Sequence, residues 1–434
     1  MKNESRQMLS EQLNQEARQL DAADPLGPFR NEFHFPQTDD GCPEIYLVGN
    51  SLGLQPKITR EFILQELDSW QTRGVRGHFE GELPWMPYHE FLSETMADLV
   101  GAKPEEVVVM NTLTVNLHLM MATFYRPRGK RKQILMERQA FPSDFYAVES
   151  QARWHGLDPA ECIVQVEPEK GHSTFSTDQV CQAIETHRET LAMILLPGVQ
   201  YYTGQVIDMQ AITQKAHEFD IPVGFDLAHA TGNIPMKLSE WDVDFACWCT
   251  YKYLNSGPGS IGGCFVNSRH SSDPSCFRLA GWWGDAKATR FRMENQFRAI
   301  PTAEGWQLSN PPILSAAAVR ASLEVFRRAG GMQPLREKSL QLTGFFRKCL
   351  EQRLPGLVQI LTPEQPEGHG CQLSLKVDLR GISGKAVFEQ LERVGARTDW
   401  REPDVIRAAP VPLYNSFQDV YRFVEELARI MEAG

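Results

Sequence analysis

Short apolar runs alternate along the chain with segments whose apolar residues recur at helical spacing. Between residues 45 and 267 the runs are brief and rich in β-branched and aromatic residues, which is typical of buried strands. We predict strands at 45–48, 107–110, 134–136, 162–164, 193–196, 221–225, 245–249 and 262–266. Helical spacing predicts helices at 115–124, 142–155, 177–188 and 208–219. Strands that are apolar on both faces and alternate with helices indicate an α/β fold with a mostly parallel sheet covered by helices.

The two ends of the chain show different patterns. Residues 1–45 combine a polar helix with several prolines, a composition suited to an arm laid over another surface. Beyond the prolines at 311 and 312, the pattern predicts helices at 314–328, 334–350, 384–394 and 416–432 and strands at 373–377 and 405–407. We therefore expect an N-terminal arm (1–45), a large α/β domain (46–315) and a small C-terminal α+β domain (316–434) that begins with a long connecting helix.

Composition narrows the class of protein. Of 434 residues, 42% are hydrophobic and 23% charged, as in packed globular proteins. The net charge of -11 argues against binding to nucleic acid or an anionic membrane surface, so we expect a small-molecule or protein partner. Nine cysteines without a C-x-x-C pair favour a reducing cytoplasm. We find no secretory signal and no apolar run long enough to span a membrane, and we expect a soluble, full-length chain.

Two motifs match known signatures. Residues 257–262 (GPGSIG) fit the dinucleotide pattern G-x-G-x-x-G, but a predicted strand follows them where that fold needs a helix, which favours a glycine-rich turn. Residues 49–53 (GNSLG) fit the nucleophile elbow G-x-S-x-G and lie between a strand and a helix. With Asp226 and His229 downstream, Ser51 allows a serine hydrolase as an alternative function, although the motif is also a simple turn at the start of a helix.

A third group of residues points to pyridoxal phosphate. Asp226 ends one buried strand, and Lys252, flanked by Tyr251 and Tyr253, follows another. A lysine at this position can form the Schiff base, and an aspartate can pair with the protonated pyridine nitrogen so that the ring accepts electrons. Taken alone, the same residues are equally compatible with a surface lysine and an aspartate that caps a helix.

Two further strand ends support the same chemistry. Residues 111–114 (NTLT) lie between a strand and a helix, where backbone N–H groups and a hydroxyl can hold a phosphate, although Thr114 can also act as a simple N-cap. Residues 141–144 (FPSD) follow the next strand. Phe141 could stack on a pyridine ring and Asp144 could lie at its edge, unless Phe141 belongs to the core.

At this point the chain resembles the kynureninase family of fold-type I pyridoxal phosphate enzymes. The stretches that carry the resemblance cover nearly the whole chain: 49–56, 113–118, 140–144, 202–205, 225–230, 243–249, 251–255, 309–314 and 407–414. The resemblance implies a large domain with a seven-stranded type of sheet and a homodimer with shared active sites. It also implies hydrolysis of L-kynurenine or 3-hydroxy-L-kynurenine to anthranilate or 3-hydroxyanthranilate plus L-alanine, in tryptophan catabolism.

The resemblance assigns roles to residues that match the family's motifs. Those expected to bind the cofactor are Leu113, Thr114, Phe141, Pro142, Ser143, Asp144, Asp226, His229, Tyr251 and Lys252, together with Trp282 and Asn310 from the neighbouring subunit. Lys252, Asp226 and Tyr251 are the expected catalytic residues, with Tyr251 moving protons or, as the alternative, only binding the phosphate. Some relatives carry a hydroxyl residue where Pro197 stands, which puts that cofactor contact in doubt.

The substrate is expected to contact four residues: Arg407, His78, Ser51 and Asn310. Arg407, at a strand end of the small domain, suits a bidentate clamp on the α-carboxylate, the alternative being a surface arginine. His78 and Asn310 match positions that hold the same residue types in the hydroxykynurenine-preferring branch of the family, and both can hydrogen-bond a ring hydroxyl, so the resemblance implies a preference for 3-hydroxykynurenine. The alternatives are a surface histidine for His78 and a contact with the cofactor phosphate for Asn310. A desulfurase or aminotransferase with the same cofactor remains the main alternative function.

Overall fold

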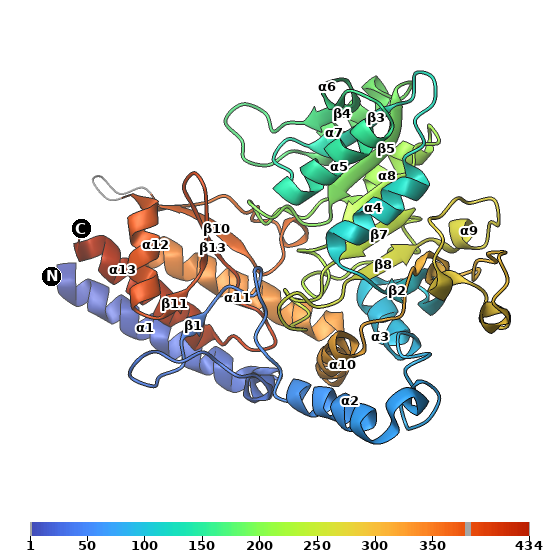
Figure 1. Ribbon diagram of the computed structural model, residues 1–434. Coiled ribbons are helices and arrows are strands. Elements are labelled where there is room, and N and C mark those ends of the chain that lie inside the picture. Colours follow the sequence, from blue (N-terminus) through green and yellow to red (C-terminus); the bar gives the residue numbers. More distant parts are fainter. Residues whose placement is uncertain (1, 378–382, 434) are drawn as a thin grey trace.

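A seven-stranded sheet forms the centre of the larger part of the molecule (Figure 1), and the computed structural model describes residues 2–377 and 383–433. The strands lie in the order β2-β8-β7-β6-β5-β3-β4. Their bounds are β2 Val107–Val109, β3 Gln133–Glu137, β4 Ile163–Val166, β5 Leu191–Pro197, β6 Val223–Asp226, β7 Phe245–Trp248 and β8 Gly263–Val266. Only β8 runs antiparallel to its neighbours, so the predicted mostly parallel sheet is confirmed.

Helices cover both faces of this sheet, because its strands carry apolar side chains on both sides. Alternate strand residues belong to two separate cores. One core joins Val109, Leu196 and Phe225 to α3, α7, α8 and α10, whereas the other joins strand residues such as Ile134 and Cys247 to α4 and α5. The helices of this part are α2 Thr59–Arg73, α3 Glu90–Val100, α4 Leu113–Phe124, α5 Pro142–Trp154, α6 Pro159–Cys162, α7 Thr177–Thr186, α8 Met209–His217, α9 Ser268–Ser271 and α10 Ile313–Arg328.

The smaller part is built on a four-stranded antiparallel sheet in the order β12-β13-β10-β9. Its strands are β9 Val358–Ile360, β10 Leu373–Val377, β12 Asp399–Arg401 and β13 Val405–Ala408, and its helices are α11 Met332–Arg353, α12 Gly384–Arg393 and α13 Phe417–Ala433. Sequence periodicity found β10, β13 and all three helices, but missed β9 and β12, which are three residues long.

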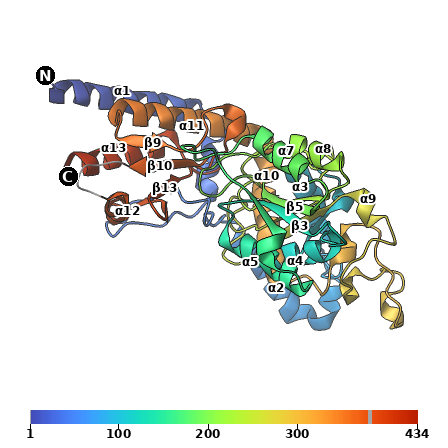
Figure 2. The same ribbon diagram turned by 90° about the horizontal axis from the view of Figure 1, so that it is seen from above.

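The N-terminal segment packs against this smaller part. Its helix α1 (Lys2–Ala23) runs beside α11 and α13, so both ends of the chain lie at the same end of the molecule (Figure 2). Lys338 of α11 forms a buried ion pair of 2.7 Å with Asp24, and the Phe417 backbone N–H donates to Asp21 over 2.7 Å. Strand β1 (Ile45–Tyr46) then pairs with β11 (Ala396–Arg397). The proposed domain boundaries at residues 45 and 315 stay predictions.

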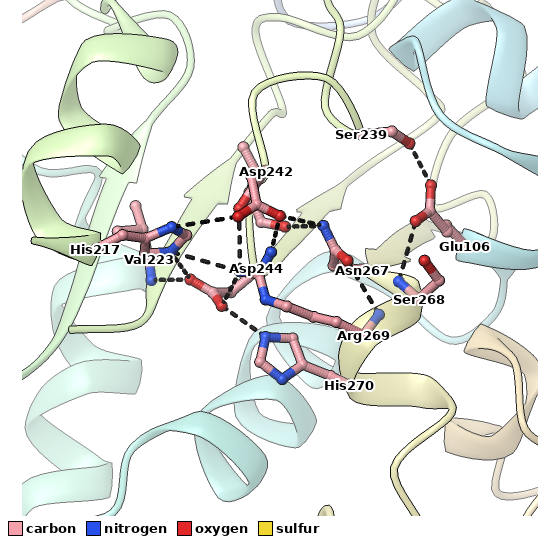
Figure 3. Close-up of polar contacts among 11 residues, drawn as sticks. Glu106, His217, Val223, Ser239, Asp242, Asp244, Asn267, Ser268, Arg269 and His270 are labelled. Atoms are coloured by element: carbon pink, nitrogen blue, oxygen red, sulfur yellow. Dashed lines mark hydrogen bonds and ion pairs between the residues drawn. The ribbon is translucent and has the colours of Figure 1, made fainter. Parts of the chain in front are cut away.

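A network of polar side chains connects the amino ends of the strands that lead to the candidate site (Figure 3). Asp244, buried just before β7, accepts the Val223 backbone N–H over 2.7 Å and lies 2.9 Å from His217 Nε2 and 2.6 Å from His270 Nε2. Arg269 donates to the same carboxylate over 2.6 Å. The network therefore joins β6, β7, α8 and α9 at the amino ends of the strands, whereas the candidate site lies at their carboxyl ends.

In the part of the chain that the structure describes, no helix combines the length and the apolar character that crossing a bilayer requires.

Candidate active site

A cavity of about 200 Å³ opens at the carboxyl ends of the large sheet, where ligands bind in folds of this kind. It is lined by Thr112, Leu113, Thr114, Glu137, Phe141, Ser143, Asp144, Pro197, Val199, Tyr201, Asp226, Ala228, His229, Tyr251 and Lys252. The structure thus brings together the strand ends that sequence analysis singled out after β2, β3, β6 and β7. Pro142, the first residue of α5, is adjacent to this lining.

Two helix N-termini meet at one end of the cavity. Thr114 Oγ1 of α4 lies 2.8 Å from Ser143 Oγ of α5. The N-cap of α4 is Thr112, not Thr114 as the alternative interpretation had it, and its side chain makes no capping bond. Phe141 likewise makes no side-chain cap at α5. Uncapped N–H groups and two hydroxyls form an anion-binding site suited to a phosphate.

Glycines let the neighbouring turns approach this end closely. Asn111 takes a left-handed conformation (φ 51°) as the chain turns from β2 into α4, and its carbonyl accepts the Gly262 N–H over 2.7 Å. A Cβ on Gly262 would lie 2.8 Å from the Trp248 carbonyl oxygen and 3.4 Å from the Leu113 nitrogen. Residues 257–262 therefore form the predicted glycine-rich turn, which leads into β8 and not into a helix.

Two buried carboxyl groups, Asp144 and Asp226, face each other in the cavity. Burial raises the pKa of Asp144 well above its usual range, and the adjacent Asp226 carboxylate raises it further. Burial also raises the pKa of Asp226, but a hydrogen bond from Asp144, the Ala228 N–H at 2.6 Å and the charge of Lys252 oppose that rise. Asp144 therefore holds the proton of the pair and Asp226 carries the negative charge.

Lys252 points into the same cavity from the turn after β7. Its Nζ lies 2.9 Å from His229 Nε2 and 5.9 Å from the centre of the Phe141 ring. Burial lowers the pKa of His229 well below its usual range, and the charge of Lys252 lowers it further, so this imidazole is neutral and can accept a hydrogen bond. Burial also raises the pKa of Tyr251, whose hydroxyl keeps its proton at neutral pH.

The GNSLG segment is a connecting turn in the structure. The Gly53 N–H donates to the Tyr251 carbonyl over 2.9 Å, and a Cβ on Gly53 would collide with Asn255 and with the carbonyl of Lys252. Within residues 2–377 and 383–433, no hydrogen bond joins Ser51 to His229, whose Nε2 faces Lys252 instead. These contacts support the helix-start turn over the nucleophile elbow.

Sequence analysis missed two polar residues of the cavity, Glu137 and Tyr201. Glu137 is the last residue of β3, and burial raises its pKa to about 8. Tyr201 follows β5, and its ring packs edge-on against Phe141 with the ring centres 5.3 Å apart. Glu137 directly follows the predicted strand 134–136, and Tyr201 lies in the loop that follows β5, so the rule that ligands gather at strand ends could have identified them. Pro197, paired in register with Asp226, also lines the cavity but can offer only apolar contact.

Arg407 is buried, with 1% of its surface exposed, which excludes the alternative of a surface arginine. It lies behind Tyr201: its Nη1 donates to the Tyr201 carbonyl over 2.8 Å, and its Cζ is 5.9 Å from the Tyr201 ring centre. The guanidinium is close enough to the cavity for its charge to lower the pKa of His229, after the larger effects of burial and Lys252.

Besides Pro142 and Arg407, four predicted site residues are not among the described residues that line the cavity: His78, Trp282, Asn310 and Ser51. His78 and Trp282 instead belong to one surface aromatic cluster with Phe79 and Phe291. Ring centres are 6.2 Å apart for His78–Phe79, 6.5 Å for Phe79–Phe291 and 5.4 Å for Trp282–Phe291. Trp282 is 44% exposed and Phe79 66%. The structure thus joins two predicted site residues that are 204 positions apart, but on the surface of a single chain.

The cavity fits pyridoxal phosphate on its own chemistry. Asp144 Oδ1 and His229 Nδ1 are buried without a hydrogen-bond partner among the described residues. Asp226 carries the negative charge of the acid pair, so it offers a partner for a cationic pyridine nitrogen. The hydroxyls of Thr114 and Ser143 provide the phosphate site, and the exposed face of Phe141 is an aromatic surface for the ring.

Two family models match parts of the chain. The model described as "Kynureninase C-terminal domain" matches residues 335–427, and the model of the "DegT/DnrJ/EryC1/StrS aminotransferase family" matches residues 83–236. Together they cover segments of both the smaller and the larger part of the molecule.

Solved structures with the same fold are more distant in sequence. A variant of C-DES with glycine covalently linked to its PLP cofactor is 17% identical, with a TM-score of 0.76 over 89% of this chain and 96% of that one. The cysteine desulfurase CsdA from Escherichia coli is 18% identical, with a TM-score of 0.75 over 94% of this chain and 98% of that one. At such identity the likeness shows the fold alone, and it confirms the predicted fold type I.

Curated relatives are much closer. Proteins named kynureninase from Koribacter versatilis, Xanthomonas campestris and Stenotrophomonas maltophilia are 52%, 54% and 53% identical over 407 or 408 residues. Each alignment covers 94% of this chain and 95% or 96% of the relative. The resemblance seen in the sequence motifs is thereby confirmed, and the chain belongs to the kynureninase family.

Proposed function

We propose that this chain is a pyridoxal phosphate-dependent hydrolase that converts L-kynurenine or 3-hydroxy-L-kynurenine to anthranilate or 3-hydroxyanthranilate and L-alanine. The observation that carries the proposal is the single cavity that holds Lys252, the Asp144–Asp226 pair and two uncapped helix N-termini. Membership of the kynureninase family supports the choice of this reaction among those open to the fold. A place in tryptophan catabolism follows from the substrate.

When bound, the cofactor supplies an electron sink that stabilises negative charge on substrate carbon. Lys252 would hold the cofactor through its amine, and the same amine, when free, could move the proton of the substrate α-carbon. His229, which is neutral and 2.9 Å away, can accept a hydrogen bond from the lysine. Asp226 keeps the pyridine nitrogen protonated, because its carboxylate carries the charge of the acid pair.

The remaining residues bind the substrate and move later protons. Water adds to the side-chain ketone, and the bond between the β-carbon and the former ketone carbon breaks. The aryl carboxylate leaves, and the electron pair of the broken bond stays on the β-carbon of the alanine fragment. Tyr251, whose hydroxyl keeps its proton, is positioned to protonate the alanine fragment. Arg407 binds the α-carboxylate through the N–H groups that its protein partners leave free.

Assembly and location are part of the proposal. We infer a homodimer in which the aromatic cluster of His78, Phe79, Trp282 and Phe291 faces the cavity of the second subunit. An exposed cluster of this kind is typical of an interface. A cytoplasmic location agrees with nine cysteines that are free in the structure. Exposed Asn310 and the Ser51 turn would reach the substrate only if the dimer places them there.

The reaction is tested on the purified, cofactor-loaded protein. It should show a yellow absorbance band that borohydride abolishes, and it should release anthranilate and L-alanine in equal amounts from L-kynurenine. Lys252→Ala should lose turnover by several orders of magnitude with its fold intact, whereas Lys237→Ala, at an exposed lysine paired with Glu240, should match the parent. Release of alanine from cysteine alone would instead support a desulfurase, and dependence on a keto acid an aminotransferase.

We further propose that 3-hydroxykynurenine is the better substrate. A ring hydroxyl loses free energy on burial unless it is hydrogen-bonded, and His78 and Asn310 both offer such bonds. The ratio of kcat/KM for the two substrates should favour the hydroxylated one in the parent and fall about tenfold or more in His78→Phe. An unchanged ratio in the variant would remove His78 from the substrate pocket while leaving the reaction itself untouched.

A further inference from the structure

Arg407 is held on one side by an acid that no part of the proposed mechanism uses. Asp399 of β12 lies directly opposite Arg407 of β13 in the antiparallel register. Its Oδ1 accepts from Arg407 Nε over 3.1 Å and lies 2.9 Å from Nη2. One carboxylate oxygen therefore contacts both Nε and Nη2 of the guanidinium and fixes the plane of that group.

These contacts decide which donors of Arg407 remain for a ligand. A guanidinium has five N–H groups. Nε and Nη2 use one each on Asp399, and Nη1 uses one on the Tyr201 carbonyl. One N–H on each terminal nitrogen is then left, and these two form the fork that binds a carboxylate with two parallel hydrogen bonds.

Asp399 also balances charge in a region of low solvent access. Its side chain is 11% exposed and that of Arg407 is 1% exposed. Burial lowers the pKa of Arg407, and the charge of Asp399 opposes that effect. A second guanidinium, Arg401, shares the acid: its Nε lies 3.0 Å from the same Oδ1, and its Nη2 donates to Oδ2 over 3.1 Å. Without the acid, the two arginines would repel each other.

The held arginine is connected to the cavity through one residue. The Tyr201 carbonyl accepts from Arg407, while the Tyr201 ring lines the cavity and packs against Phe141. A shift of Arg407 would therefore move a bound substrate carboxylate relative to a cofactor ring that stacks on Phe141.

We propose that Asp399 is a positioning residue that aligns the Arg407 guanidinium for the α-carboxylate of the substrate. The inference rests on the proposed role of Arg407 as carboxylate clamp. Asp399 touches neither the substrate nor the cofactor and acts through Arg407 alone. Its effect is accordingly specific for ligands that carry an α-carboxylate.

The test compares two ligands on the cofactor-loaded enzyme. L-Alanine carries the α-carboxylate, and the decarboxylated amine analogue of kynurenine carries the aryl ketone and amine without it. In Asp399→Asn, binding of L-alanine, followed by the change in cofactor absorbance, should weaken about tenfold or more, because an ionic hydrogen bond has been lost. The inhibition constant of the decarboxylated analogue should stay within about twofold of the parent value. KM for kynurenine should rise more than kcat falls.

A matched control is available in the same hairpin. Glu402 lies 3.5 Å from Lys385 and its side chain is 72% exposed, so Glu402→Gln should leave both ligands unaffected. Arg407→Gln should show the same selective loss as Asp399→Asn, and combining the two changes should add nothing further. Should Asp399→Asn not fold, Asp399→Glu keeps the charge but shifts the acceptor, and the same selective loss is expected.

Two results would overturn the inference: unchanged binding of L-alanine in Asp399→Asn, or equal weakening of both ligands. Both results differ from the result expected if Arg407 does not bind the substrate α-carboxylate at all. In that case Arg407→Gln would bind L-alanine as the parent does, and the proposed role of Arg407 would be lost first.

Discussion

Asp144 and Asp226 are the same residue type in one cavity, but their surroundings give them opposite charge states. Asp144 is protonated because burial and the neighbouring Asp226 carboxylate raise its pKa well above the usual range. Burial also raises the pKa of Asp226, but less far, because Asp144, the Ala228 N–H and Lys252 stabilise its anion. An asparagine side chain is neutral and can donate a hydrogen bond, as a protonated acid can. It therefore imitates Asp144 but not Asp226.

We predict that Asp226→Asn lowers kcat by several orders of magnitude while Asp144→Asn lowers it about tenfold or less. The measurement is turnover of kynurenine at saturating cofactor, with the bound cofactor quantified by absorbance in each variant. The assignment of charge within the pair would be wrong if the two variants lost equal activity, or if added cofactor restored Asp226→Asn to the parental rate.

At the scale of elements, the turns around the site depend on close backbone contact. The Gly53 N–H donates to the Tyr251 carbonyl, and Gly53 has no room for a Cβ against the Lys252 turn. Ser51, two residues earlier, is partly exposed. Gly53→Ala should therefore displace Lys252 and reduce kcat at least tenfold, whereas Ser51→Ala should keep a substantial fraction of activity. Loss of all turnover in Ser51→Ala with cofactor still bound would revive the serine hydrolase.

The network around Asp244 lies at the amino ends of the strands, and we predict that it stabilises the fold (Figure 3). Burial raises the pKa of Asp244, but hydrogen bonds from His217, His270 and the Val223 N–H outweigh burial, so the pKa lies below its usual value of 3.8. Protonation therefore favours the unfolded chain. The stabilisation by the carboxylate is complete above the unfolded pKa and is lost as pH falls through the folded one.

We expect Asp244→Asn to lower the free energy of unfolding by about 1–3 kcal/mol at pH 7. The difference from the parent should shrink below about pH 4. Asp242→Asn is the control, because Asp242 contacts the same Arg269 but its side chain is 60% exposed, and it should change stability by about 0.5 kcal/mol or less. Denaturant unfolding at several pH values gives both numbers, and a difference that grows toward acid pH would contradict the assignment.

Most elements could be predicted from the sequence because buried strands and amphipathic helices leave regular apolar patterns. The helix predicted at 314–328, for instance, is Ile313–Arg328 in the structure. The three-residue strands β9 and β12 are too short to show a period. At the site, Asp226 and Lys252 could be predicted because an aspartate and a lysine stand at the ends of buried strands. No pattern in the chain could show that Asp399 faces Arg407, because that contact depends on the register of two strands.

At the scale of the whole molecule, the predicted site residues separate into two groups that one chain does not bring together. Lys252 and Asp226 line the cavity, whereas Trp282 lies in the surface aromatic cluster with His78. If two copies of the chain pair with two-fold symmetry, each cavity takes its lysine from one subunit and its tryptophan from the other. The arrangement makes a prediction that does not depend on knowing the interface in detail.

Lys252→Ala and Trp282→Ala, each weakly active or inactive alone, should recover activity when mixed under conditions that let subunits exchange. In a mixed dimer one cavity carries both changes and the other carries neither, so random pairing gives roughly a quarter of the parental activity. Mixing Lys252→Ala with Asp226→Asn is the control and should restore nothing, because both residues belong to the same cavity and chain. If exchange is demonstrated by differently tagged subunits and activity still does not return, Trp282 does not complete the cavity of a partner. The lysine and the tryptophan would then have to act within one chain, and the surface aromatic cluster would need another explanation.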